Sequence, residues 1–274
     1  MQFKVREIVQ ATGGRLLAGS AGAPAGRIVT DTRALAAGET FLALRGRRFD
    51  GHAFLEKAVR RGASCLVVDR PESLDALGRT DARLAVVQAP DTLEALGALA
   101  RAARKRLKCP VIAITGSCGK TTLKEMVGQV LGRRLKGRLP PKSFNNLIGV
   151  PLTLLGAEKD DEFVVSEFGT SAPGEIARLS AMAEPTIGAV TLVGPAHLEG
   201  LGSLEGVAAE KGVLVESLPP KGLAVLNADD PRVAAMAGRC RARVVTFGRC
   251  EGADLRAEDL IQTDRSIQFT AVAA

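Results

Sequence analysis

Short apolar runs alternate with amphipathic segments along most of the chain. In the first third, each apolar run is brief and bounded by turn residues, which is typical of strands joined by short helices. The pattern predicts a small α/β domain over residues 1–88. Its expected elements are helices at 5–12 and 54–61 and strands at 28–30, 40–44 and 65–69.

Residues 92–108 have strong helical spacing and end in basic residues, and Cys109-Pro110 then ends the helix. We place a domain boundary just before this helix, so the second domain covers residues 89–274. Beyond it, strand and helix patterns alternate, which predicts a P-loop-type, mostly parallel sheet with helices on both faces. The expected strands are 111–115, 163–167, 187–192, 222–226 and 243–247, and the expected helices are 121–133, 174–182 and 204–217.

The C-terminal tail, residues 254–274, ends in an alternating strand pattern at 266–272. The pattern stops at Ala274 without a capping element. We therefore expect this chain to be incomplete.

The composition favours a globular protein of two domains. Hydrophobic residues make up 46% of the 274 residues and charged residues 24%, which argues against disorder. No apolar run is long enough to span a bilayer, and the N-terminus lacks the apolar core of a signal peptide. The five cysteines are scattered without C-x-x-C spacing, so neither a disulfide framework nor a zinc site is indicated. These features predict a cytoplasmic location.

The net charge of +7 raises the question of nucleic-acid binding. However, the arginines are spread along the chain, there is no Trp or Tyr, and only nine Phe could stack on bases. We expect a small, strongly anionic substrate instead, and no nucleic acid.

The segment most informative about chemistry follows the apolar strand at 111–115. It consists of Gly116, Ser117, Cys118, Gly119, Lys120, Thr121 and Thr122, and a helix pattern begins directly after it. Glycines let such a turn close on phosphate at the positive end of the helix, a lysine contacts the β- and γ-phosphates, and a threonine hydroxyl binds Mg²⁺. The longer pattern G-x-x-x-x-G-K-[ST] would need glycine where Ile114 stands. The strand before and the helix after still predict an ATP-binding loop.

Polar residues also follow other strands of this sheet, where open α/β sheets bind ligands. Glu167 ends one strand and is placed to hold Mg²⁺, and His197 follows the next. Asn227 and Asp229 could bind a purine or ribose, although Asn-Ala-Asp-Asp-Pro is equally good turn chemistry. Lys211, taken alone, is an ordinary helix lysine.

Together these residues resemble the ATP-dependent Mur ligases of peptidoglycan synthesis. The resemblance rests on four ordered motifs: Thr115–Thr122, Phe144–Leu155, Glu167–Gly169 with Gly174-Glu175-Ile176, and Ala196–Ser203. The Asn-Asn-x-x-Gly-Val-Pro and His-Leu-Glu-Gly segments are most similar to the members that add D-alanyl-D-alanine.

The resemblance implies an amide ligase that couples UDP-N-acetylmuramoyl-tripeptide to D-alanyl-D-alanine at the expense of ATP, through an acyl phosphate. It implies that Lys120 binds the γ-phosphate, that Thr121 and Glu167 bind one Mg²⁺, and that His197 binds a second. Lys211 aligns with a lysine that is carbamoylated in these ligases. These implied roles make Lys120, His197 and Lys211 the expected catalytic residues.

The resemblance also implies the substrate-binding residues. Two N-terminal segments look like those that hold the UDP-sugar, and the paired asparagines are expected to contact substrate as well. The residues are Asp31, Thr32 and Arg33, then Asp50, Gly51 and His52, and finally Asn145 and Asn146.

The chain departs from the family pattern in three places. Ser171-Ala172 replaces an Asn-His pair of some relatives, and Gly212-Val213 follows Lys211 where Gly-Glu is expected. We expect the family's third, C-terminal domain to be absent from this chain, and we therefore expect little ligase turnover from it alone. The third residue of the peptide stem and the oligomeric state stay open, with a monomer expected.

Two alternatives remain. The chain could be another Mur or folylpolyglutamate-type ligase that adds a different amine. It could also be a non-catalytic protein that binds a nucleotide or a UDP-sugar.

Overall fold

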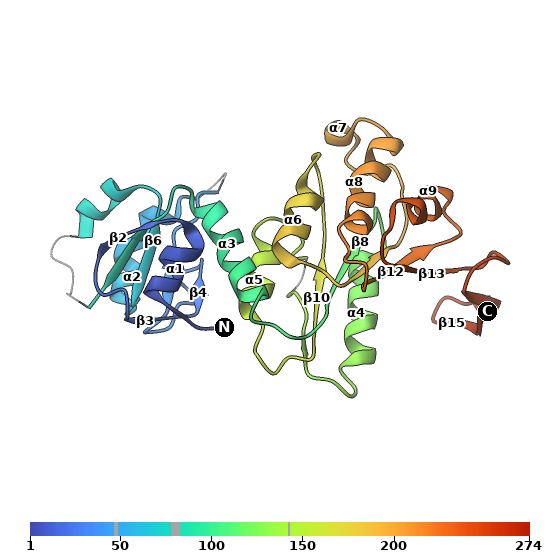
Figure 1. Cartoon of the computed structure of the whole chain (residues 1–274), viewed down its shortest axis with the longest axis horizontal. Helices are drawn as coiled ribbons and strands as arrows, with labels where there is room; N and C mark the ends of the chain where they lie inside the picture. Colours follow the sequence, from blue (N-terminus) through green and yellow to red (C-terminus); the bar gives the residue numbers. More distant parts are fainter. Residues whose placement is uncertain (47–48, 78–82, 142) are drawn as a thin grey trace. The chain divides into compact units, whose positions relative to one another are not determined.

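The computed structural model describes residues 1–46, 49–77, 83–141 and 143–274, and Figure 1 shows their helices and strands. The chain forms two compact units. Unit 1 consists of Met1–Leu107 with Leu154–Lys159, and unit 2 of Lys108–Thr153 with Asp160–Ala274. Helix α3 (Thr92–Arg104) belongs to unit 1, whereas the expected domain boundary falls before it. The division of the chain into domains at residue 88 stays a prediction.

Unit 1 is built on a five-stranded sheet in which only the pair β2 and β7 is antiparallel. Three of its strands match predicted ones, each shorter at its C-terminal end. Strands β2 and β7 had not been predicted, and neither had the separate pair formed by β1 (Phe3–Lys4) and β3 (Pro24–Gly26). The order is β2 (Arg15–Ala18), β7 (Ala85–Gln88), β6 (Cys65–Val68), β5 (Thr40–Leu42) and β4 (Ile28–Val29).

The helices of unit 1 begin and end at residues with local physical reasons. Helix α1 (Val5–Thr12) buries Val5 and Ile8 and ends at Gly13, whose φ of 63° favours glycine. Helix α2 (Leu55–Arg60) follows a 3₁₀ turn at Gly51–Phe54 that Asp50 caps, and a second 3₁₀ turn covers Pro71–Leu77. The expected helix 92–108 is too long: α3 ends at Arg104, because the amides of Arg106 and Leu107 bond three residues back in tighter turns.

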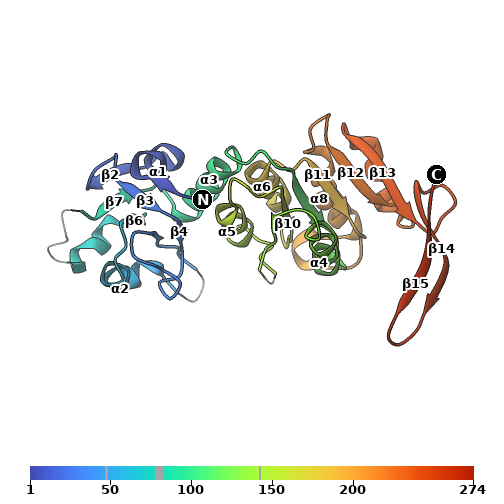
Figure 2. The ribbon, with the colours of Figure 1, turned by 90° about the horizontal axis from the view of Figure 1, so that it is seen from below.

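Unit 2 is built on an eight-stranded sheet. All neighbouring strands are parallel except β14 and β15, which form the antiparallel hairpin visible in Figure 2. The five expected strands of the alternating region are confirmed within two residues at each end. The order is β15 (Ile267–Ala273), β14 (Leu255–Gln262), β13 (Arg243–Gly248), β12 (Leu223–Asn227), β11 (Ile187–Val190), β8 (Val111–Thr115), β10 (Phe163–Glu167) and β9 (Gly137–Arg138).

Helices cover both faces of this sheet, as predicted. Helix α4 (Lys120–Leu131) packs its apolar side chains against Ile112 and Ile114, whereas α8 (Leu204–Glu216) belongs to a different apolar cluster that includes Val190. Consecutive residues of a strand point to opposite faces of a sheet, so the two apolar clusters lie on opposite faces. Helix α6 (Glu175–Ala183) lies beside α8 (Figure 1).

Helix α5 (Gly149–Gly156) was not predicted as a helix because Pro151 interrupts its pattern. The proline lies in the first turn, where no intrahelical N–H is lost. Asn146 Oδ1 accepts the backbone N–H groups of Ile148 and Gly149, at 3.1 and 2.9 Å, and so caps the helix start. The remaining short elements are α7 (Leu198–Leu201), α9 (Pro231–Ala234) and a 3₁₀ turn at Ala235–Arg239.

All five cysteines are free thiols. Burial raises the pKa of Cys65 to about 12, whereas Cys118 and Cys250 are exposed. Within the described ranges, no helix is both long enough and apolar enough to cross a membrane.

Candidate functional site

The predicted phosphate loop connects β8 to α4 through two glycines with positive φ. Gly116 has a φ of 146° and Gly119 a φ of 82°, which are conformations that side chains disfavour. A Cβ atom on Gly116 would lie 1.8 Å from Thr191 Oγ1. Glycine at position 116 is therefore required by both backbone conformation and the packing of the neighbouring strand end.

Hydrogen bonds attach this loop to the segment after β11. The Ser117 amide donates to Leu192 O at 2.8 Å, and the Gly194 amide donates to Ser117 Oγ at 2.9 Å. The Thr191 hydroxyl donates to Cys118 O at 2.6 Å. The loop is thus held in shape before any ligand binds, which lowers the entropic cost of binding.

Helix α4 begins at Lys120, directly after the loop. Gly119 cannot cap the helix with a side chain, so the first N–H groups and the positive end of the helix dipole are available to an anion. The Lys120 ammonium donates to Gly116 O at 2.7 Å, which folds its charge back over the loop. Thr121 and Thr122 are exposed beside it.

Glu167 ends β10 and lies behind the loop with only 1% of its surface exposed. Its Oε2 accepts the Thr121 hydroxyl at 2.9 Å, and its Oε1 accepts the Asn145 amide at 3.0 Å. A carboxylate beside a hydroxyl is the kind of oxygen donor set that suits Mg²⁺ when phosphates complete the shell. The residues present therefore fit this ion, although no group of three His, Cys, Asp or Glu side chains within the described ranges is arranged to hold a metal.

One cavity of about 290 Å³ in unit 2 is lined by all three expected catalytic residues, Lys120, His197 and Lys211. His197 lines it from the start of α7, where its φ of 56° is left-handed and its side chain is exposed. Thr170, Ser171 and Glu175 also line the cavity and had not been expected there. Its lining consists of Gly116, Ser117, Lys120, Asn145, Asn146, Gly169, Thr170, Ser171, Glu175, His197 and Lys211.

Lys211 is a buried residue of α8, with 2% of its surface exposed, rather than an ordinary surface lysine. Burial, together with the positive charge of Lys120, lowers the pKa of Lys211 to about 8, although Glu210 opposes this shift. A fraction of the amine is therefore neutral near neutral pH.

Sequence reasoning missed Glu210, which links α8 to the loop before α6. Its carboxylate accepts the amides of Gly174 and Ile176 at 2.8 and 2.7 Å and the Thr170 hydroxyl at 3.4 Å. Because Gly174 offers no capping side chain, this carboxylate satisfies the start of α6. Val207, Glu210 and Lys211 have the spacing of one helix face, and that was the available signal.

Asn227 and Asp229 do not line this cavity. The Asn227 side-chain amide donates to Thr191 O at 2.8 Å, and Asp229 accepts the amides of Arg249 and Cys250 at 2.8 and 2.9 Å. Both side chains thus have partners in the turns that follow the strands. Their part in binding ATP stays a prediction.

Unit 1 contains a second cavity, of about 400 Å³, that includes four of the six N-terminal residues expected to bind substrate. Asp31, Thr32, Arg33 and Gly51 line it. Six further lining residues were not predicted: Thr30, Phe41, Leu44, Phe49, Phe54 and Lys57. The exposed aromatic rings and the cations suit a ligand with both a planar group and anionic groups.

Within this cavity, Arg33 and Asp31 form a bidentate pair, with Arg33 Nη2 2.7 Å from Asp31 Oδ2. The Arg33 side chain is 82% exposed. Hydrogen bonds from Arg33 lower the pKa of Asp31, so the carboxylate stays ionised at neutral pH.

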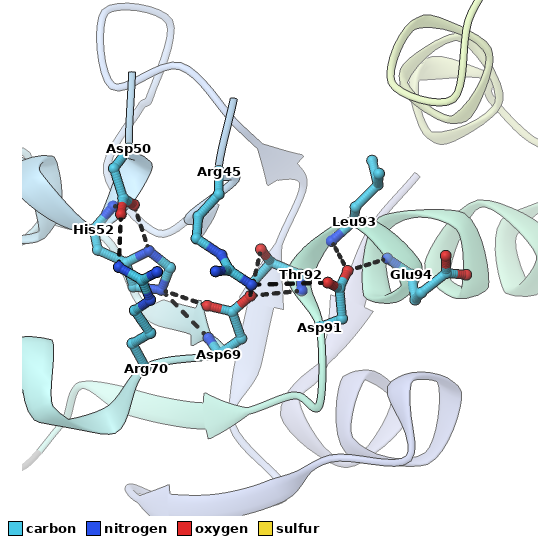
Figure 3. Close-up of polar contacts among 9 residues, drawn as sticks. All are labelled: Arg45, Asp50, His52, Asp69, Arg70, Asp91, Thr92, Leu93 and Glu94. Atoms are coloured by element: carbon cyan, nitrogen blue, oxygen red, sulfur yellow. Dashed lines mark hydrogen bonds and ion pairs between the residues drawn. The ribbon is translucent and has the colours of Figure 1, made fainter. Parts of the chain in front are cut away.

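Asp50 and His52 are absent from the lining of this cavity. His52 is 7% exposed, and its Nδ1 lies 2.7 Å from Asp50 Oδ1 (Figure 3). Burial raises the pKa of Asp50, but hydrogen bonds from His52 and the charge of Arg70 outweigh this and lower it. Contact of Asp50 and His52 with a substrate stays a prediction.

Two family models match the sequence of this chain. The model described as "Mur ligase middle domain" matches residues 114–273, which is more than half of the chain. The chain belongs to the Mur ligase family. A second Mur ligase model, "Mur ligase family, catalytic domain", matches residues 26–104.

Relatives and solved structures agree on one branch of this family. A UDP-N-acetylmuramoyl-tripeptide--D-alanyl-D-alanine ligase of Synechocystis is 42% identical over 229 residues, covering 83% of this chain and 49% of that protein. MurF of Acinetobacter baumannii superposes with a TM-score of 0.87 at 31% identity, covering 100% of this chain and 59% of that one. MurF of Thermotoga maritima, solved with ADP, has a TM-score of 0.78 at 30% identity, covering 90% and 56%. The chain spans about half the length of the curated relatives that it matches.

Proposed function

We propose that this chain binds the UDP-sugar substrate and ATP for a ligase that adds D-alanyl-D-alanine to UDP-N-acetylmuramoyl-tripeptide. The observation that carries the proposal is the cavity of unit 2, which Lys120, His197 and Lys211 line together with Asn145, the partner of the Glu167 carboxylate. The relatives' name and the ADP in the Thermotoga maritima structure support it.

The proposed reaction has two steps. A carboxylate oxygen of the tripeptide attacks the γ-phosphorus of ATP, the bond to the bridging oxygen breaks, and ADP leaves. The amine of D-alanyl-D-alanine then attacks the acyl carbon, inorganic phosphate leaves and one proton is released. Both substrates of the first step are anions, so the charge of Lys120 and the amides at the start of α4 would offset their repulsion.

Thr121 and Glu167 would hold one Mg²⁺, and His197 is our candidate ligand of a second. Bound Mg²⁺ would neutralise charge that develops on the phosphate oxygens. The other contributions come from the protein: Ser117 and the glycines shape the loop, and Asn145 orients Glu167 through its amide.

Carbamoylation of Lys211 is a further part of this proposal. Carbon dioxide reacts with a neutral amine, and the lowered pKa of Lys211 supplies that form near neutral pH. The product is an N-carboxylate, formed when the amine nitrogen attacks the carbon and releases one proton. It would turn a cation of the cavity into an anion able to face Mg²⁺.

The UDP moiety would bind in unit 1, in the cavity that Asp31, Thr32, Arg33 and Gly51 line. Arginine suits the diphosphate, and the exposed rings of Phe49 and Phe54 suit stacking on a base. Both substrates are nucleotides of the cytoplasm, which is where we expect the protein, as a monomer.

Calorimetric titration of the purified chain tests this proposal. We expect ATP with Mg²⁺ to bind, and UDP-N-acetylmuramoyl-tripeptide to bind better than the corresponding dipeptide form. Lys120→Ala should weaken ATP binding about tenfold or more, since charge-assisted hydrogen bonds to phosphate are lost. It should leave tripeptide binding unchanged, which serves as the internal control.

The same titration separates the alternatives. Preference for the dipeptide form would indicate a different Mur ligase, and binding of a folate substrate would indicate a folylpolyglutamate-type ligase. Binding of neither UDP ligand would contradict the assignment of the unit 1 cavity. A non-catalytic binding protein would bind the ligands in the same way. An assay of ADP formation in the presence of the tripeptide distinguishes it, because such a protein would not form the acyl phosphate.

A further inference from the structure

We propose that His52 is a positioning residue that sets the shape of the UDP-substrate cavity from behind, without touching the substrate. This inference rests on the proposed function of that cavity. It differs from the expectation that His52 itself binds substrate.

The ring of His52 joins two aspartates from different parts of unit 1 (Figure 3). Nδ1 lies 2.7 Å from Asp50 Oδ1, whereas Nε2 accepts the Asp69 backbone amide at 3.3 Å and lies 3.2 Å from Asp69 Oδ1. Asp50 stands in the segment before α2, whereas Asp69 directly follows β6. The side chains of His52 and Asp69 are only 4% and 2% exposed, so water does not compete strongly for these contacts.

The Asp69 carboxylate connects the neighbourhood of the ring to other segments of unit 1. Its Oδ2 accepts the Thr92 amide and hydroxyl, both at 3.3 Å, and lies 3.1 Å from Arg45 Nη2. Its buried Oδ1, by contrast, has no hydrogen-bond donor within the described part of the chain. The His52 ring is the polar group that faces this oxygen. The Nε2 atom of the ring accepts the Asp69 backbone amide at 3.3 Å, so the ring holds this segment through its main chain rather than through Oδ1.

The opposite end of the bridge reaches the cavity through the backbone. Asp50 Oδ1 also accepts the His52 amide at 2.9 Å, which fixes the turn that begins with Gly51. Gly51 lines the cavity, and its amide donates to Leu44 O at 2.7 Å. A Cβ on Gly51 would lie 2.8 Å from Leu44 backbone atoms, so the two segments touch. Movement of the ring would therefore move lining residues.

The same network extends to the start of α3. Arg45 lies between Asp69 and Asp91, at 3.1 and 3.9 Å, and Asp91 caps α3 through the amides of Leu93 and Glu94 (Figure 3). Thr92, 1% exposed, binds Asp69 from the first turn of that helix. His52 thus connects the cavity wall to the end of β6 and, through Asp69, to the start of α3.

Binding of UDP-N-acetylmuramoyl-tripeptide to His52→Ala and His52→Gln tests the inference. We expect the affinity of both variants to fall about tenfold, because the wall loses its hydrogen-bonded support. Added imidazole should restore affinity in His52→Ala by occupying the vacated space between the carboxylates. The matched control is Arg70→Ala, which removes an exposed partner of Asp50, 3.3 Å away, and should bind as the wild type does.

Cys65 reports whether unit 1 remains folded, because its thiol is fully buried in β6. It should stay unreactive to thiol reagents in each variant. If both His52 variants expose Cys65, the ring serves stability alone and the inference is overturned. Unchanged affinity, an equal loss in Arg70→Ala, or a lack of imidazole rescue would also overturn it. Failure of the wild type to bind would instead overturn the proposed function of the cavity, and this inference with it.

Discussion

Lys120 and Lys211 line the same cavity although they are 91 positions apart in the chain, and the positive charge of Lys120 lowers the pKa of Lys211. Burial of Lys211 is the larger cause of the shift, and Lys120 adds to it. The interaction between the two lysines connects the phosphate loop at the start of α4 to helix α8.

Replacing Lys120 by Ala should raise the pKa of Lys211 above its value of about 8, toward the ordinary 10.5. NMR titration of ¹³C-methylated lysines measures this pKa, and Lys211→Arg identifies the signal. The exposed Lys221→Ala is a matched control that removes a lysine elsewhere in unit 2. An unchanged pKa in Lys120→Ala would show that the two ammonium groups do not interact.

Lys211→Met should stabilise the folded chain more at pH 7 than at pH 10. Between the folded pKa of about 8 and the ordinary 10.5, the unfolded chain holds a proton that the folded chain has released. The contribution of Lys211 to the free energy of unfolding therefore rises with pH through this window. Urea unfolding at both pH values measures the difference. If Lys211→Met changed the free energy of unfolding equally at both pH values, the shifted pKa of Lys211 would be contradicted.

Glu210→Ala should lower the free energy of unfolding by about 2–3 kcal/mol, because buried amides at the start of α6 lose their acceptor. Glu210→Gln retains one acceptor oxygen and should cost less. Glu216 lies on the same helix as Glu210 and forms an exposed ion pair with Arg239. Glu216→Gln is the control and should change the free energy of unfolding little. Chemical denaturation provides the comparison, and equal stability of Glu210→Ala and Glu216→Gln would refute the capping role.

Gly116→Ala should abolish nucleotide binding, because its Cβ would lie 1.8 Å from Thr191 Oγ1 at a φ that side chains disfavour. Gly238→Ala is the matched control, since nothing lies within 4 Å of its added Cβ. Calorimetry with ATP measures both variants. Normal affinity in Gly116→Ala would mean that the loop adopts another conformation when ATP binds.

ATP should protect Cys118 from thiol reagents. Cys118 and Cys250 are exposed, whereas burial raises the pKa of Cys65 to about 12 and keeps it unreactive. Mass spectrometry after brief labelling distinguishes the sites. Cys250 serves as the internal reference, and equal labelling of Cys118 with and without ATP would argue against binding at this loop.

The elements that depend on local pattern could be read from the sequence. The apolar run of β8 predicts a buried strand, and the glycines after it predict a tight turn. Both signals come from neighbouring residues, so the phosphate site was predicted. The family resemblance also supplied Lys211, which periodicity alone left on the surface. Helix α5 was missed, because Pro151 breaks a helical pattern unless it lies in the first turn.

The lengths of several elements depended on contacts that no local pattern records. Helix α3 stops at Arg104 although helical spacing continues to Lys108, since its last residues tighten into turns. Strand β2 is absent from the predicted elements because it is mostly exposed and pairs with β7, more than sixty residues later.

The sequence by itself determined the alternating sheet, the phosphate loop and the family, because apolar periodicity and glycine conformations act over a few neighbouring residues. Only the tertiary structure decided that Thr121 and Asn145 meet on Glu167, and that His52 points inward to Asp69 rather than into the cavity. A side chain's partners are chosen where distant segments pack together. The burial that results determines whether a polar residue binds a ligand or supports the wall behind it.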